Sequence, residues 1–295
     1  MPLVLFCLIA ATLIGPRSAA AQNAADVGTL IIAHGGGEAW NGRVKEVVAQ
    51  TNPGGPVELA FLMGPDAATH RFQDAVAALA RRGAQRIVVV PLLVSSHSGH
   101  YEQIRWLTGE VDELSEVMRH HLAMAGIERP AETVPMVLAP AMDDAPEVAR
   151  VLTERALALA EQPSSEAVML VGHGPNGLED LAAWMENLRR VAEGVRTQGG
   201  FRDVRVGLVQ DDAPAAVRAE AVRRVRDLVE LQASTTGRPV VVVPILVSKG
   251  EVSDRKLPAD LSGLTIRYSG EPLLPHEGMA RWIEARVHSA VGHGR

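Results

Sequence analysis

The sequence has little cysteine, few aromatic residues and no excess of positive charge. Its one cysteine, Cys7, lies in an N-terminal segment that we expect to be removed, so the mature chain would have no disulfide and no thiolate metal site. Any metal site must therefore use histidine and carboxylate ligands. Aromatic residues make up 3% of the chain and the net charge is -6, which argues against base-stacking platforms and against the basic stripe that nucleic-acid binding needs.

The N-terminal segment has the pattern of a signal peptide. An apolar run over 3–14 is followed by Gly15, Pro16 and the small residues of 18–21. The run is too short to span a bilayer comfortably, and small residues suit a signal peptidase. We therefore expect residues 1–22 to be a signal peptide cleaved near Ala21, a periplasmic or secreted mature protein, and no membrane span after cleavage.

The remainder of the 295-residue chain is long enough for two domains, and it alternates apolar strands with amphipathic helices. Strand patterns cover 28–33, 57–62, 86–91 and 134–138, and helical spacing covers 41–50, 67–82, 103–125 and 145–161. This alternation predicts right-handed crossovers and a mainly parallel sheet.

The same order of segments then recurs in the second half. AVMLVGHG (167–174) repeats TLIIAHGG (29–36), VRVGLV (204–209) repeats VELAFL (57–62), RPVVVVPILVSKGEV (238–252) repeats RIVVVPLLVSSHSGH (86–100), and GEPLLPHEGMARWIEARV (270–287) repeats LAPAMDDAPEVARVLTER (138–155). Four matched segments in one order indicate a tandem duplication. The predicted fold class is α/β, with two tandem Rossmann-like lobes over 27–162 and 165–290. Each lobe is expected to be a mainly parallel sheet flanked by helices, and the boundary falls in the polar stretch 161–166.

Histidines follow two of the predicted strands at their carboxyl ends. His34 ends the first strand and precedes three glycines, while the strand over 86–91 opens at Pro91 into a polar loop with His97 and His100. Ligands of α/β folds bind outside the carboxyl ends of the strands, so we expect the two loops to face one another across a single cleft.

The two halves differ at these positions. His173 corresponds to His34, but Lys249 and Glu251 stand where the first half has its two loop histidines. One working site is therefore predicted, with the second half closing or supporting it and with His173 as a relic of the duplication.

Plainer interpretations stay open for these residues. His34 and its glycines could form an anion-binding turn, and His97 and His100 could face solvent. The acidic pairs at 143–144 and 211–212 each precede Ala-Pro and a helix, so helix capping is the default expectation for both, with a role in the cleft as the less favoured interpretation of 211–212.

The repeated segments resemble the sirohydrochlorin chelatases of the class II tetrapyrrole chelatase superfamily. The resemblance rests on LIIAHG at the first strand, VELAFL at the second, RIVVVPLLVSSHSGHYEQI at the third and PLLPHEGMARWIEARV near the end, and it covers most of 28–288. It implies a lyase that inserts a divalent metal into a sirohydrochlorin-type tetrapyrrole, with Co²⁺ favoured over Fe²⁺ and Ni²⁺. The metal is then a substrate, no organic cofactor is implied, and the chain is expected to be a monomer or a homo-oligomer.

The resemblance also implies roles for particular residues. His34 and His100 take the positions of the two histidines that face metal and tetrapyrrole, as catalytic and metal-ligating residues, with His97 as a competing ligand. Neutral imidazole suits divalent Co, Fe and Ni. Neighbouring residues are expected to bind the macrocycle, namely Gly35, Gly36, Ser95, Ser96, Ser98 and Gly99. Cations that would meet the macrocycle's carboxylates are Arg43, Lys45, Arg71, Arg105 and Lys249.

One departure from the family pattern leaves a second function open. Where a carboxylate commonly assists near the end of the second strand, this sequence has Met63, and Asp66 lies close by but out of register. The alternative is therefore an exported metal- or tetrapyrrole-binding protein on a chelatase fold without catalysis. A hydrolase or isomerase acting on a phosphate ester ranks last, because the sequence has no matching nucleophile signature.

Overall fold

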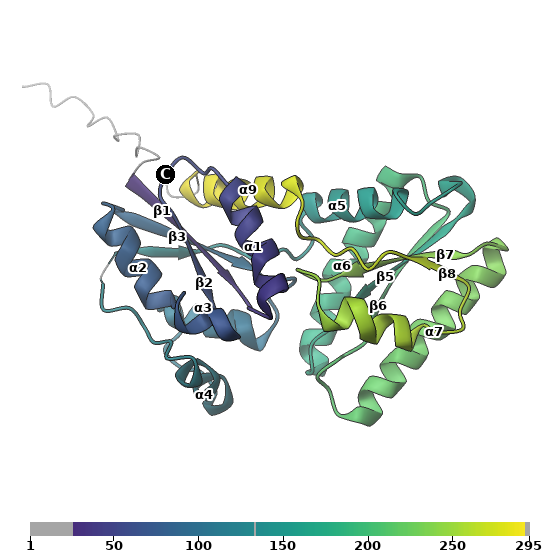
Figure 1. Cartoon of the computed structure of the whole chain (residues 1–295), viewed down its shortest axis with the longest axis horizontal. Coiled ribbons are helices and arrows are strands. Elements are labelled where there is room, and N and C mark those ends of the chain that lie inside the picture. The colour runs from purple at the N-terminus through teal and green to yellow at the C-terminus, as the bar shows by residue number, and fades with distance from the viewer. Residues whose placement is uncertain (1–25, 133, 293–295) are drawn as a thin grey trace, which may run out of the picture.

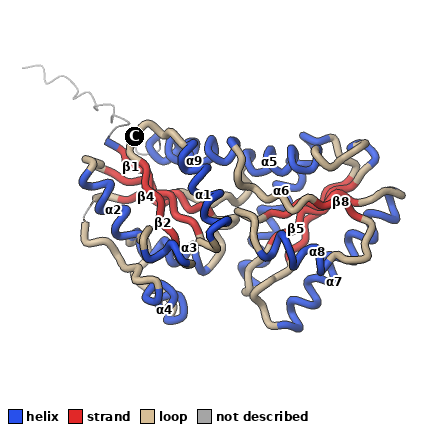
Figure 2. Tube along the Cα trace, viewed as in Figure 1, coloured by secondary structure: helices blue, strands red, loops and turns tan. Residues whose placement is uncertain are grey.

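The computed structural model describes residues 26–132 and 134–292, which form two four-stranded parallel sheets (Figures 1 and 2). The first sheet has the order β2-β1-β3-β4 and the second the order β6-β5-β7-β8. The strands of the first are β1 (Val27–Ala33), β2 (Val57–Phe61), β3 (Arg86–Leu92) and β4 (Met136–Leu138). Those of the second are β5 (Ala167–Gly172), β6 (Asp203–Leu208), β7 (Val240–Ile245) and β8 (Ile266–Tyr268). The predicted signal peptide, residues 1–22, lies outside the described residues.

The two sheets repeat one another residue by residue. In the first, Ile31 pairs with Leu59 on one side and with Val90 on the other. In the second, its counterpart Leu170 pairs with Val206 and Val243, which are the counterparts of those two residues. The predicted fold class, two α/β lobes with parallel sheets flanked by helices, is confirmed.

Helices cover both sheets. They are α1 (Glu38–Gln50), α2 (Phe72–Arg81), α3 (Gly99–Thr108), α4 (Glu116–Met124), α5 (Pro146–Leu157), α6 (Leu178–Gly199), α7 (Ala215–Thr236), α8 (Leu257–Asp260) and α9 (Glu277–Gly292). The single helix predicted over 103–125 is wrong. Gly109 ends α3 in the left-handed conformation (φ 79°), and α4 starts afresh after Ser115, whose hydroxyl accepts a hydrogen bond from the Met118 N–H.

The last helix of each repeat packs on the sheet of the other. Helix α5 follows β4 in the chain but packs against β7 and α6, whereas α9 follows β8 but packs against β3 and α1. Figure 1 shows α9, in yellow, beside the purple helix α1. Trp282 and Ile283 of α9 are fully buried in the same core cluster as Ile31 and Val90 of the first sheet. This exchange joins the two lobes through one shared core cluster, while each lobe also has a core cluster of its own.

None of the helices in the described part of the chain combines the length and the apolar character needed to span a bilayer.

Candidate metal site in the interlobe cleft

A cavity of about 1190 Å³ lies between the lobes, at the carboxyl ends of both sheets. The loops after β1 and β3 line it from the first lobe, and those after β5, β6 and β7 line it from the second. Its apolar walls include Trp40, Leu93, Met118, Trp184 and Leu246. Sites for drug-sized ligands span about 300–1,000 Å³, so this cavity has room for a larger molecule.

His34 occupies a tight turn at the end of β1. Gly35 has φ 92°, and a Cβ atom there would lie 2.0 Å from the Met63 carbonyl oxygen, so only glycine fits. His34 Nδ1 donates a hydrogen bond to the Gly35 carbonyl (2.7 Å). Because Nδ1 carries the proton, Nε2 of the neutral ring keeps its lone pair for a ligand.

His100 lies in the first turn of α3, which Ser98 caps through a hydrogen bond from the Tyr101 N–H. His100 Nδ1 lies 2.8 Å from Gln103 Oε1, and Gln103 Nε2 donates to the Met118 carbonyl (2.8 Å). The second bond sets the orientation of the amide, so its oxygen faces the histidine and accepts from Nδ1. His100 therefore also keeps its Nε2 lone pair.

The two rings meet edge to face, with 4.6 Å between their centroids. Burial lowers the pKa of His34, and burial together with the neighbouring His34 ring lowers the pKa of His100 to about 4. Both imidazoles are therefore neutral at pH 7, which is the form that binds a metal ion.

His97 does not join this pair. Its side chain is exposed and does not line the cavity, and its backbone carbonyl accepts a hydrogen bond from Trp184 Nε1 (2.6 Å). Of the residues expected beside the histidines, the structure places five on the cavity wall, namely Gly35, Gly36, Ser95, Ser98 and Gly99. Ser96 is not among the lining residues; its hydroxyl and N–H donate to Asp143 (2.7 and 2.8 Å).

The predicted capping roles of both acidic pairs are wrong. Helix α5 begins after Ala145 and α7 after Pro214, and no side chain caps either helix. The carboxylates serve tertiary contacts instead. Asp143 holds the Ser96 loop, and Asp144 pairs with Arg190 of α6 at 3.0 Å.

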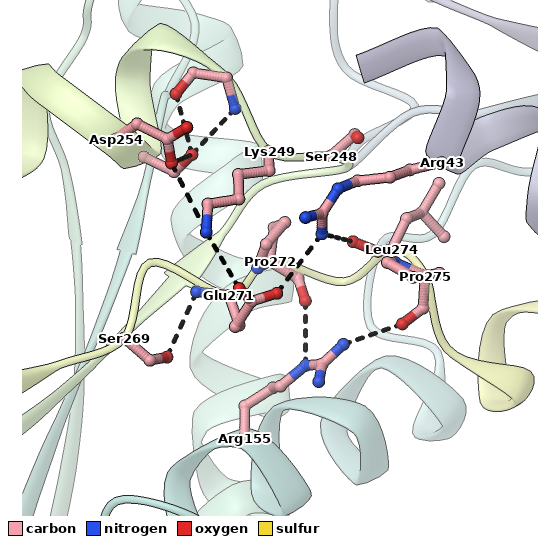
Figure 3. A network of polar contacts seen from close by, with 12 residues as sticks. Arg43, Arg155, Ser248, Lys249, Asp254, Ser269, Glu271, Pro272, Leu274 and Pro275 are labelled. Atoms are coloured by element: carbon pink, nitrogen blue, oxygen red, sulfur yellow. Dashed lines mark hydrogen bonds and ion pairs between the residues drawn. The ribbon is translucent and has the colours of Figure 1, made fainter. Parts of the chain in front are cut away.

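Two of the five candidate cations line the cavity, Arg43 and Lys249, and they come from opposite lobes. Both bind Glu271, with Lys249 Nζ at 3.0 Å and Arg43 Nη1 at 3.4 Å (Figure 3). Burial alone would raise the pKa of Glu271, but Lys249 and Arg43 outweigh it and lower that pKa. The other three cations pair with carboxylates outside the cavity: Lys45 with Asp66, Arg71 with Asp74 and Arg105 with Glu102.

The segment that carries Glu271 is held in place by a second arginine. Arg155 of α5 donates to the carbonyls of Pro272 (3.1 Å) and Pro275 (2.9 Å). Figure 3 shows Arg155 and Arg43 reaching the same stretch of chain from different elements. The positions of Arg43 and Lys249 in the cavity therefore depend on contacts between segments more than a hundred residues apart in the sequence.

The second lobe supplies carboxylates for which the sequence favoured helix capping over a role in the cleft. His173, Asp211 and Asp212 line the cavity, and one ligand atom of each lies within 4.8 Å of the others. His173 Nε2 is 3.2 Å from Asp212 Oδ2 and 4.0 Å from Asp211 Oδ2. A signal was present in the sequence, because VQDD follows β6 where the first repeat has LMGP, with Met63, after β2.

A third carboxylate, Asp180 at the start of α6, also lines the cavity. Burial raises the pKa of Asp180 and outweighs the opposing effect of His97, with Glu179 contributing in the same direction as burial. A raised pKa makes this carboxylate a better proton acceptor than an ordinary aspartate. No sequence motif marked it, since its burial depends on how the lobes meet.

A known family model matches the lobe that carries the histidine pair. Residues 28–159, from β1 through α5, match the CbiX family model. Both His34 and His100 lie within this matched segment, whereas His173 lies outside it. No curated protein matches the chain.

The described part of the chain has the two-lobed fold of solved chelatases. SirB from Bacillus subtilis with Fe³⁺ matches at 15% identity and a TM-score of 0.64, over 91% of this chain and 97% of that one. The sirohydrochlorin chelatase SirB from Bacillus subtilis subspecies spizizenii, in complex with cobalt, matches at 16% identity and 0.58, over 91% and 96%. DR2241 from Deinococcus radiodurans, a multi-domain protein with structural similarity to chelatases, matches at 18% and 0.54, over 89% of this chain and 54% of that one. The expected resemblance to the sirohydrochlorin chelatases is confirmed.

Proposed function

We propose that this chain inserts a divalent metal into a sirohydrochlorin-type tetrapyrrole, with Co²⁺ as the first choice and Fe²⁺ or Ni²⁺ as the alternatives. The observation that carries the proposal is the pair of partly buried, neutral histidines, His34 and His100, whose free Nε2 atoms belong to one large cavity. The similar SirB structures hold Fe³⁺ and cobalt, which supports iron and cobalt among the metals proposed.

Two imidazoles without a thiolate suit this chemistry. Nitrogen ligands bind divalent Co, Fe and Ni well, yet a two-ligand site holds the ion weakly enough to release it to four ring nitrogens. The cavity's apolar side chains would contact the face of the macrocycle. Arg43 and Lys249 would bind its peripheral carboxylates in exchange for Glu271.

Insertion releases two protons, because the ion replaces the hydrogens of two pyrrole N–H groups. Asp180 lines the same cavity and its pKa is raised, so it is the side chain that we propose as the acceptor of one of these protons, while the other passes to water. This role would compensate for Met63, which stands where the family commonly has a carboxylate.

The test is an optical titration of sirohydrochlorin and Co²⁺ with the wild-type chain and with His34→Ala and His100→Ala. Metal insertion changes the macrocycle's absorption spectrum, and we expect turnover to fall at least about a hundredfold in either variant. The matched control is His288→Ala, which removes an exposed histidine outside the cavity and should leave the rate unchanged. Full activity in both cavity variants would contradict the proposal.

A second candidate is a metal- or tetrapyrrole-binding protein that does not catalyse insertion. Met63 favours it, since the first lobe has no carboxylate at the end of β2. The same titration separates the two functions. Binding of metal and macrocycle by the wild type, without insertion of any of the three ions, would support the carrier and exclude the chelatase.

We also propose export of the protein to the periplasm or beyond, with cleavage near Ala21. The apolar run over 3–14 and the small residues that follow it support this location.

A further inference from the structure

We infer a second divalent-cation site on the C-terminal lobe, formed by His173 Nε2 and Asp212 Oδ2. It lies in the same cavity as His34 and His100 but on the other lobe. The inference depends on the proposed function only for the choice of ion; the site itself is argued from its own geometry.

A lone pair of His173 Nε2 faces a lone pair of Asp212 Oδ2. His173 Nδ1 lies 2.7 Å from the Gly174 carbonyl, which accepts hydrogen bonds only, so Nδ1 carries the ring proton. In the neutral ring, Nε2 then has a bare lone pair, and the carboxylate oxygen of Asp212 lies 3.2 Å from it. Two acceptors at this separation repel one another unless a positive charge lies between them.

The separation fits a metal ion. Ligand atoms that each lie about 2.1 Å from an ion are about 3.0–3.4 Å apart for bond angles between the octahedral and tetrahedral values. The distance of 3.2 Å between His173 Nε2 and Asp212 Oδ2 falls in this range. One imidazole and one carboxylate are ligands that suit divalent Co, Fe and Ni.

The neighbouring Asp211 already pairs with two cationic side chains, so it is not counted as a metal ligand. Its side chain is 2% exposed, and Lys256 Nζ (2.6 Å) and Arg218 Nε (2.9 Å) each bind one of its oxygens. The Asp212 side chain is 68% exposed, and within the described residues it pairs with no lysine or arginine. The site therefore has two protein ligands, open to solvent, with water completing the coordination. Such a site captures an ion that exchanges readily, and the same cavity then leads to the histidine pair.

The test counts cobalt ions by equilibrium dialysis of the untagged protein against CoCl₂, with the visible absorption of bound Co²⁺ as a second readout. We expect the double variant His173→Ala/Asp212→Asn to bind one ion fewer than the wild type. The double variant His34→Ala/His100→Ala should lose a different ion and keep this one. Lys256→Met frees a third ligand, Asp211 Oδ2, and should tighten the site about tenfold or more. The control His288→Ala/Asp144→Asn changes an exposed histidine and an exposed carboxylate outside the cavity and should bind as the wild type does.

Three results would overturn the inference. The number of bound ions could be unchanged in His173→Ala/Asp212→Asn, which would mean that His173 is an imidazolium paired with Asp212. Both double variants could lose the same single ion, which would mean that the two lobes bind one ion together rather than one ion each. Lys256→Met could leave the cobalt affinity unchanged. Loss of ion binding only at His173 and Asp212, with no ion at His34 and His100, would instead support this site and contradict the proposed function.

Discussion

Gln103 holds the ring of His100 through a hydrogen bond of 2.8 Å between its Oε1 and Nδ1 of the histidine. Gln103 is 1% exposed, and its amide nitrogen is anchored on the Met118 carbonyl. Gln103 therefore sets both the tautomer and the ring orientation of His100, although Gln103 does not itself bind the metal.

Gln103→Leu should weaken Co²⁺ binding at the histidine pair. Without the acceptor, His100 no longer favours the proton on Nδ1, and changes to such outer partners typically cost about 10–100-fold in metal affinity. Cobalt dissociation constants, measured by competition with a chelator, check this. Gln73→Leu is the matched control, because that glutamine bonds a backbone carbonyl at an exposed position. Equal affinities for both variants would show that Gln103 has no positioning role.

Metal binding should persist into the acidic range. Because burial lowers the pKa of His100 to about 4, protons displace the metal from this ligand only when the pH approaches that value. An ordinary histidine, with a pKa of about 6.5, would already be half protonated at about pH 6.5 and almost fully protonated at about pH 4. We expect the cobalt affinity to be nearly constant from pH 7 to about 5 and to fall below it. A tenfold loss by about pH 6 would contradict the lowered pKa.

Removing the cavity's cations should affect binding of the macrocycle more than its chemistry. Lys249→Met should raise the KM for sirohydrochlorin about tenfold with a small change in kcat, because the lost contact is to a peripheral carboxylate. Steady-state kinetics at saturating metal measures both constants. Lys45→Met is the control, since Lys45 pairs with Asp66 away from the cavity. Glu271→Gln should lower the KM, because it releases Lys249 and Arg43 from their internal partner.

The predicted boundary between the repeats contains a buried ion pair. The Glu166 side chain is fully buried and pairs with Arg267 of β8, and it accepts from the N–H groups of Glu161 (3.0 Å) and Gln162 (3.1 Å). Burial alone would raise the pKa of Glu166, but these hydrogen bonds outweigh it and lower the pKa below 4.5. The stretch 161–166 therefore connects the two repeats and also binds β8 through the pair of Glu166 with Arg267.

Glu166→Gln should destabilise the protein by about 3 kcal/mol, because it leaves Arg267 without its buried carboxylate. A carboxylate with a lowered folded-state pKa stabilises the fold above its unfolded pKa and loses that effect as the pH falls through the folded value. The difference from wild type should therefore be full at neutral pH and shrink below pH 4.5. Urea unfolding across this pH range measures it, with exposed Glu193→Gln as the control.

The export proposal predicts a shorter mature chain. Expression with its own leader in a bacterial host should yield a periplasmic protein whose N-terminus follows Ala21, as read by intact mass. A protein that keeps residues 1–22 and stays in the cytoplasm would contradict this proposal.

The sequence by itself determined the elements that depend on local patterns. Apolar runs predicted both sheets, the repeat predicted their equivalence, and the strand ends placed His34 and His100 at one edge, because parallel strands end together. The HG dipeptide of β1 recurs after β5, since each turn requires a glycine with positive φ. The family resemblance followed from these same segments.

Only the tertiary structure decided which helix packs on which sheet and which distant residues meet in the cavity. The sequence pattern of α9 shows which face is apolar but not which sheet it covers, so the exchange with α5 is visible only in the fold. The start of α3 at Gly99 put His100 against His34 and left His97 exposed. Glu271 binds Arg43 across 228 positions of the chain, and Asp211 and Asp212 reach the cavity from the other lobe. Contacts at such separations depend on how two packed lobes meet, and no local pattern of residue types records that.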